Sequence, residues 1–247
     1  MTVASFSATG LRAIPPDEAR ALDRLPPLLS VIAGMVEVLG FLTLGGLFTA
    51  HVTGNLVMIA ALLVRGGSPT APQVLALPTF IVALVAIRHF ARALDARKVT
   101  LLRPLLLIQL LLLVSVLALA IGSDIRSPNG TPGSLAAILA TCAMACQFAT
   151  MRLAVPGAPS TAVMTGNLTT AVLSFPQLLE PGRSLMQADA DRFKKASTLV
   201  VGFCCGSVVG AVAFLLFNGW SWTFPVVLAA AATLTPFVYR GASNAST

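Results

Sequence analysis

Long apolar runs dominate this chain, and they restrict it to one class of fold. A helix rises about 1.5 Å per residue, so a run of about 20 residues crosses a hydrocarbon core of about 30 Å. With 56% hydrophobic and 10% charged residues, the chain also lacks the polar surface of a soluble domain. We therefore predict an all-α, polytopic transmembrane helix bundle in a lipid bilayer, with helices at about 28–50, 74–94, 104–121, 134–153, 196–217 and 220–239.

The ends of the chain are polar. Residues 1–27 mix acidic and basic side chains and contain Pro15-Pro16, so they lack the basic start and apolar centre of a signal peptide. We expect a cytoplasmic tail here, with a short surface helix up to Leu25. Residues 28–240 then form a single transmembrane domain, and the small polar residues 241–247 form a disordered tail.

Basic residues indicate which loops lie in the cytoplasm. If six helices cross and the N-terminus is inside, thirteen of the sixteen Lys and Arg lie inside, whereas eight crossings would leave ten there. The six-crossing topology is favoured, with both termini on the cytoplasmic side of a bacterial inner membrane. Because the basic residues flank apolar runs, the net charge of +7 indicates contact with anionic lipid and not with nucleic acid.

The four cysteines do not indicate a metal site. They lie inside apolar runs, where a thiol behaves as a small apolar side chain, and no His or further Cys stands at ligand spacing: Cys142, Cys146, Cys204 and Cys205. The sequence motifs of the common hydrolases, metalloproteases and nucleotide-binding enzymes are also absent. We expect no metal, no cofactor and no enzymatic activity.

A four-residue string divides the chain into two similar halves. Thr-Gly-Asn-Leu begins at Thr53 and returns at Thr165, 112 residues later. Each copy follows a long apolar run and precedes a run too short to span, which predicts a short broken or re-entrant helix. Three crossings per half make the halves an inverted repeat, with repeat 1 at about 28–122 and repeat 2 at about 134–240. Whether the short segments re-enter or span is left open.

The two breaks are candidate binding sites. Irregular backbone at membrane depth is tolerated where it is buried in protein or lines a wet cavity. The Thr and Asn side chains are expected to cap the short helices, whose N-termini attract anionic or carbonyl groups. The alternative is that the glycines allow close helix packing and the asparagines tie neighbouring backbones together. The residues concerned are Thr53, Gly54, Asn55, Thr165, Gly166 and Asn167.

Glu37 is the one acidic residue inside a predicted spanning helix, about 13 Å from its start. A carboxylate at this depth is a functional candidate as a proton carrier, cation ligand or counter-charge, and the alternative is a hydrogen bond to a neighbouring helix. His51 precedes the first break and is a candidate proton relay, or an interfacial hydrogen-bonding group. Gln147 has roughly the place in the second half that Glu37 has in the first, and offers hydrogen bonds without titrating.

These elements resemble the YoaK-type bacterial membrane proteins, a family of unknown function. The resemblance rests on Gly34 to Glu37, Phe48 to Asn55, Gln147 to Arg152 and Val163 to Asn167. It implies an integral inner-membrane protein of about six helices and brings no established substrate. The family usually has Asp at the position of Glu37 and often has Asn at the position of Phe148.

We expect a transporter or permease for an unknown small polar solute, proton-coupled through Glu37 and His51. Its polar cavity would be lined by Glu37, Asn55, Gln147 and Asn167. The alternative is a non-transporting scaffold or accessory subunit. An intramembrane enzyme would need Glu37 and His51, fourteen residues apart, to share one pocket. Homo-oligomer formation is left open.

Overall fold

The computed structural model is helical in every element of regular structure within the residues it describes, which are 16–127, 130–155, 159–161, 163–175 and 186–244. In chain order the elements are α1 (Pro16–Thr43), α2 (Val52–Val64), α3 (Ala71–Ala96), α4 (Leu102–Gly122), α5 (Thr131–Ala154), α6 (Met164–Ser174), α7 (Met186–Phe217), the 3-10 helix η2 (Asn218–Trp222) and α8 (Thr223–Asn244).

Several of these helices have the length and composition of membrane spans. Among the described residues, five stretches are long and apolar enough to cross a membrane: Asp23–Thr43, Ala71–Ala96, Leu102–Gly122, Thr131–Ala154 and Asp189–Leu234. The last has 46 residues and contains η2 together with most of α7 and the first half of α8, which were predicted as two separate helices. The prediction of an all-α fold with several helices of membrane-spanning length is confirmed within the described residues.

Most helix boundaries lie close to those predicted, and the ends of the chain differ. α3, α4 and α5 begin and end within three residues of the predicted limits. α1 already begins at Pro16 and continues through Pro26 and Pro27. α7 begins at Met186, ten residues earlier than predicted, and α8 continues to Asn244, into the segment predicted to be a disordered tail. Residues 1–15 and 245–247 lie outside the described residues.

α1 ends at Thr43 and not near residue 50, so the predicted end of the first helix was wrong. Gly45 and Gly46 have φ angles of +70° and +74°, which L-residues with side chains rarely adopt. The Gly46 N–H donates to the Phe41 carbonyl over 3.1 Å, a bond that closes a helix C-terminus through left-handed residues. The apolar residues after Gly46 therefore form a non-helical connection to α2.

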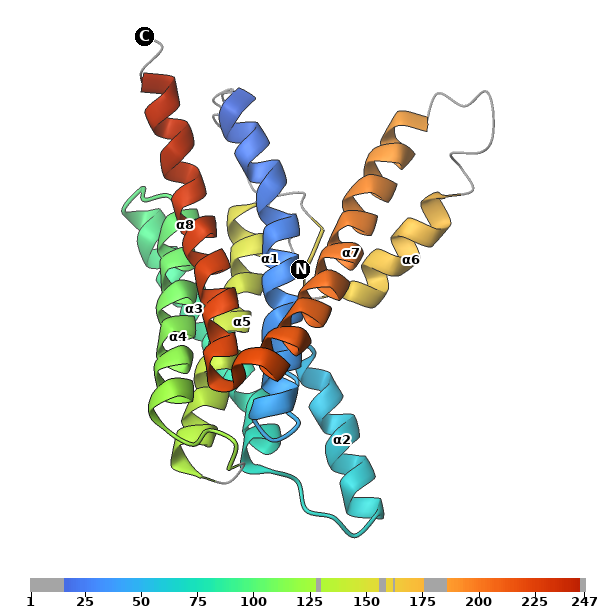
Figure 1. Ribbon diagram of the computed structural model, residues 1–247. Helices are drawn as coiled ribbons and strands as arrows, with labels where there is room; N and C mark the ends of the chain where they lie inside the picture. The colour runs from blue at the N-terminus through green and yellow to red at the C-terminus, as the bar shows by residue number, and fades with distance from the viewer. Residues whose placement is uncertain (1–15, 128–129, 156–158, 162, 176–185, 245–247) are drawn as a thin grey trace, which may run out of the picture.

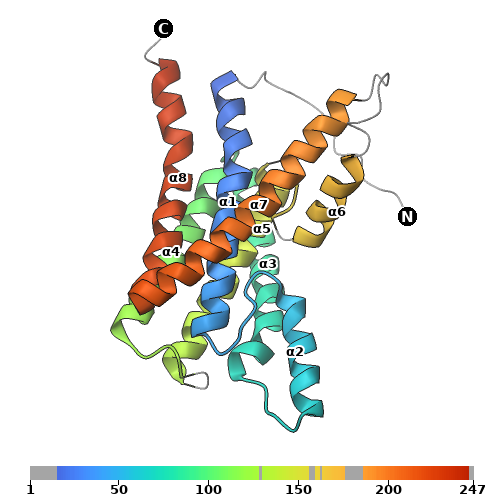
Figure 2. The ribbon, with the colours of Figure 1, turned by 45° about the vertical axis from the view of Figure 1, so that its right-hand side comes forward.

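The helices pair in the same way in both halves of the chain. The packing of α1 against α7 corresponds to that of α5 against α3. In the same way, α1 packs against α8 as α5 packs against α4, and α2 packs against α3 as α6 packs against α7. Figures 1 and 2 show that α2 and α6 project from the body of the bundle, each along that partner. α1 and α5 run in opposite directions, as do α3 and α7, and α4 and α8 (Figure 1).

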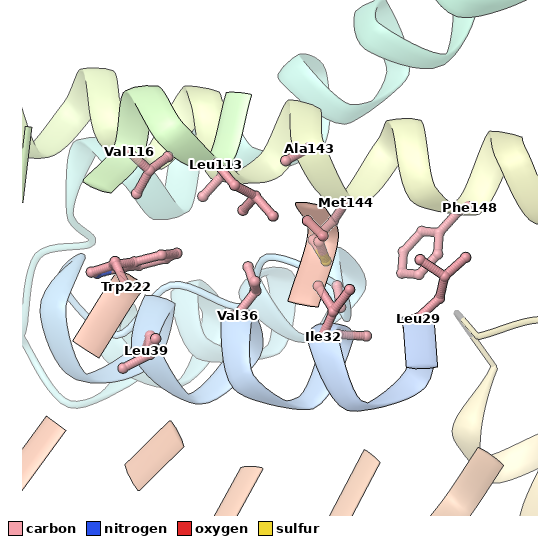
Figure 3. Packing of buried hydrophobic residues seen from close by; sticks show 14 of the residues in the cluster. Leu29, Ile32, Val36, Leu39, Leu113, Val116, Ala143, Met144, Phe148 and Trp222 are labelled. Carbon is pink, nitrogen blue, oxygen red and sulfur yellow. The ribbon is translucent and has the colours of Figure 1, made fainter. Parts of the chain in front are cut away.

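The apolar core lies between α1, α4 and α5. Ile32 and Val36 of α1 face Leu113 of α4 and Met144 of α5, and the indole of Trp222 closes the end of this layer near Val116 (Figure 3). All of these side chains are fully buried. α1 is therefore the central helix of the bundle, and its position fixes the site described below.

α1 and α7 approach each other at backbone distance. A Cβ on Gly206 would lie 2.1 Å from the Val31 carbonyl oxygen, and a Cβ on Gly34 would lie 2.1 Å from that of Phe203. Any side chain at either position would push the helices apart. Small residues at such crossings are typical of helix packing in membranes.

Candidate functional site

The candidate site is the connection between α1 and α2, which folds back against α1. Glu37, two turns before the end of α1, is 8% exposed. Its Oε2 accepts hydrogen bonds from the Thr49 hydroxyl at 3.0 Å and the Ala50 N–H at 2.6 Å. Its Oε1 accepts the His51 N–H at 3.1 Å and contacts the His51 Nδ1 at 2.8 Å. A carboxylate has about four acceptor positions, so these donors saturate Glu37.

His51 joins Glu37 to the neighbouring helix α7. Its ring meets that of Phe203 edge to face, with centroids 5.4 Å apart, and its side chain is 37% exposed. His51 lies outside the stretches that are long and apolar enough to span a membrane. The hydrogen bond with Glu37 raises the pKa of His51, the charge of Glu37 raises it further, and burial opposes both. The two ionisable candidates, fourteen residues apart in the chain, are therefore in direct contact.

Asn55 holds the same connection from the other side. Its Oδ1 accepts the Phe48 N–H at 2.9 Å, and its Nδ2 donates to the Phe48 carbonyl at 2.8 Å. In the second half, the Asn167 Nδ2 donates to the Ser160 carbonyl at 2.8 Å, again across seven residues. Each amide thus satisfies backbone groups that no helix or strand would pair.

The prediction that these residues cap the short helices was wrong. His51 and Val163 occupy the N-cap positions of α2 and α6, and neither makes a side-chain cap bond. Asn55 and Asn167 lie inside the first turn, where their side chains reach backwards along the chain and not to the helix amides. Their side chains hold the non-helical connection before each short helix and not the helix end.

The threonines and glycines of the breaks have other surroundings. Thr53 and Thr165 are exposed, whereas Gly54 and Gly166 are partly buried. A Cβ on Gly54 would lie 3.2 Å from the Phe48 ring, which is a tight contact. The absence of a side chain at Gly54 therefore leaves room for this ring. Neither Gly54 nor Gly166 needs a positive φ angle.

Gln147 is the centre of a second buried cluster. Its Oε1 accepts from the Gln109 Nε2 at 2.7 Å, and its Nε2 donates to the Leu29 carbonyl at 2.8 Å and contacts the Thr161 Oγ1 at 3.5 Å. Gln147 and Thr161 are fully buried. Thr161 follows Thr49 by 112 residues, the spacing of the repeat. Gln147 therefore contacts the threonine of the second half that is equivalent to the one bonded to Glu37 in the first half.

The hydrogen bonds therefore group the predicted site residues in two clusters, one in each half. Glu37 and Asn55 hold residues 48–51, and Gln147 and Asn167 hold residues 160–161. α1 contributes to both clusters, through Glu37 and through the Leu29 carbonyl eight residues earlier, a rise of about 12 Å.

Three residues of these clusters were not predicted. Thr49 and Thr161 belong to a longer repeat than the one recognised, because both halves read Thr-Ala-x-x-Thr-Gly-Asn-Leu. Gln109 interrupts a run of leucines, and a lone amide in such a run is a signal for a buried hydrogen bond. Across the described residues, no group of three or more His, Cys, Asp or Glu side chains is placed to hold a metal ion.

Comparisons with known proteins agree with the resemblance seen in the sequence. A search of curated proteins and a search of solved structures found no match. The model of one family, described as proteins of unknown function (DUF1275), matches residues 25–235, which include every residue of both clusters. The chain therefore belongs to this DUF1275 family of helical, membrane-like proteins.

Proposed function

We propose that this protein transports a small polar solute across the bacterial inner membrane, and that proton binding at Glu37 and His51 is coupled to transport. The observation that carries the proposal is the saturated Glu37 carboxylate, which holds the connection before α2 from inside a spanning stretch. An ionisable group in such a stretch is costly and marks ion and substrate pathways.

The proposed topology has six crossings in two inverted halves. α2 has 13 residues and α6 has 11, so they rise only about 20 Å and 17 Å, less than a hydrocarbon core. The repeated helix pairing and the opposite directions of α1 and α5 support this arrangement. Both termini would lie in the cytoplasm with most of the basic residues.

The coupling follows from hydrogen-bond capacity. The ionised carboxylate accepts from Thr49, Ala50 and His51 at once. A protonated carboxyl group has one acceptor position fewer and no negative charge, so it holds these donors less strongly. Protonation of Glu37 would therefore release residues 49–51 and let α2 shift relative to α1, as alternating access requires.

The test is a solute-uptake screen in proteoliposomes. Wild type should take up at least one polar solute faster than empty liposomes, and Glu37→Gln should reduce this uptake at least about tenfold, since it replaces the carboxylate with a neutral amide. Asp95→Asn makes the same chemical change at an exposed position and serves as the control. Wild type that moves no solute of the panel would contradict transport.

A non-transporting scaffold is the second candidate. It is favoured by the finding that Glu37 and Asn55 bond to backbone and side chains of their own half, as packing devices do. The same screen separates the two, because liposomes with a scaffold, wild type or Glu37→Gln, would take up no solute faster than empty liposomes.

We propose no enzymatic role, although Glu37 and His51 do lie together. Both oxygens of the carboxylate are occupied by protein donors, so Glu37 presents no lone pair to a substrate in this structure. The pair is better suited to hold and release a segment than to act as general acid or base.

A further inference from the structure

The buried amides of the second half form a chain of hydrogen bonds across the bundle. Gln109 of α4 donates to Gln147 of α5, and Gln147 donates to the Leu29 carbonyl of α1. Gln109 is 1% exposed and Gln147 is fully buried. The bond to Gln147 fixes the orientation of the Gln109 amide, with its Nε2 toward Gln147.

One acceptor atom in this series of hydrogen bonds receives no donor. Within the described part of the chain, the Gln109 Oε1 has no hydrogen-bond partner. A buried amide oxygen without a donor is energetically unfavourable, so a ligand that donates a hydrogen bond to it is stabilised there. Exchanging the oxygen and nitrogen of the amide would not help, because two carbonyl oxygens would then face each other at Gln147.

We infer that the Gln109 Oε1 is the acceptor of a binding site for a small neutral solute that carries an N–H or O–H donor. This inference deepens the proposed function and rests on it, because it names the chemical class of the transported solute.

The cluster's other groups favour a neutral ligand. They are an amide, hydroxyl and thiol groups and backbone carbonyls, including the Cys146 thiol, which donates to the Leu105 carbonyl one turn before Gln109. None of them can neutralise an ion, and an ion buried without a counter-charge costs several kcal/mol. A carboxamide or a small alcohol makes the missing hydrogen bond without this cost.

The inference can be tested by binding alone, without transport. Acetamide and acetone have nearly the same shape, but acetamide has an N–H donor. Saturation-transfer NMR on their methyl signals, with wild-type protein in detergent micelles, should show binding of acetamide and about tenfold weaker binding of acetone, the ratio for one hydrogen bond to a buried group.

A variant assigns the effect to Gln109. Gln109→Met keeps the length of the side chain and removes the acceptor, so it should lower acetamide binding to the acetone level. Ser115→Ala, on the same helix, removes an exposed hydroxyl that bonds the Leu111 carbonyl and should leave acetamide binding unchanged. If Gln109→Met does not fold, the comparison of the two ligands on wild type decides.

Equal binding of acetamide and acetone by wild type, or acetamide binding that survives Gln109→Met, would overturn the inference. An internal water as the partner of Gln109 would give the first of these results. Neither result affects the Glu37→Gln uptake test, so failure of this inference and failure of the transport function are distinguishable.

Discussion

The Glu37 and Gln147 clusters occupy matching places in the two halves, but they differ in what they can do. Each holds the segment before a short helix, and each does so through a threonine, Thr49 or Thr161. The first cluster contains a carboxylate and an imidazole, whereas the second contains amides. The two clusters therefore hold similar segments with different chemistry: ionisable side chains in the first and neutral amides in the second.

Glu37→Ala should have the largest effect on this comparison. It leaves the donors of Thr49, Ala50 and His51 without an acceptor, and breaking such a buried charged network costs about 3–5 kcal/mol. Denaturant unfolding in detergent micelles measures the loss. Glu37→Gln retains one acceptor oxygen and should lose less. A loss below about 1 kcal/mol for Glu37→Ala would show that the carboxylate does not hold the connection.

Gln147→Met should cost less, about 1–2 kcal/mol, because it removes neutral hydrogen bonds and keeps most of the volume. The same unfolding measurement applies. If Gln147→Met lowered the free energy of unfolding more than Glu37→Ala, the second cluster and not the first would contribute most to the stability of the bundle.

Asn55→Ala and Asn167→Ala should cost similar amounts, about 1–2 kcal/mol each, since both side chains bond backbone seven residues earlier. This pair of variants tests the asparagine-to-backbone bond that both halves have. A difference of more than about 2 kcal/mol between the two variants would mean that the breaks are not equivalent.

The pH dependence at His51 should be the smallest effect. Because the folded state raises the pKa of His51 above 6.5, its contribution to stability is complete below pH 6.5 and is lost as the pH rises through the raised value. Glu37 is the titratable group that contacts this ring. His51→Gln should therefore flatten the fall in thermal stability above pH 6.5, and an unchanged slope would contradict the pairing.

Much of this arrangement was predictable from sequence, because it depends on local patterns. Apolar runs of spanning length gave the limits of α3, α4 and α5 to within three residues, and the repeated Thr-Gly-Asn located both breaks. The end of α1 was missed because Gly45 and Gly46 stop a helix that the apolar residues alone would continue. The partners of Glu37 were missed because they depend on how the connection between α1 and α2 folds back against α1. The spacing of apolar residues along the sequence contains no information about this.

The second cluster shows the same limit. Gln147 was a candidate from its position, but its partner Gln109 lies 38 residues away on another helix. Only the packing of α4 against α5 brings the two amides together. The number of side-chain pairs that a membrane bundle can make is large, and composition alone does not choose among them.

Proton movement during solute uptake is the direct test of coupling between Glu37 and transport. Proteoliposomes with an entrapped pH dye would receive a solute that wild type transports, in the absence of an imposed gradient. Wild type and Asp95→Asn should change the internal pH, whereas Glu37→Gln should not. Solute uptake by wild type without any change in internal pH, or an equal change with Glu37→Gln, would contradict this coupling.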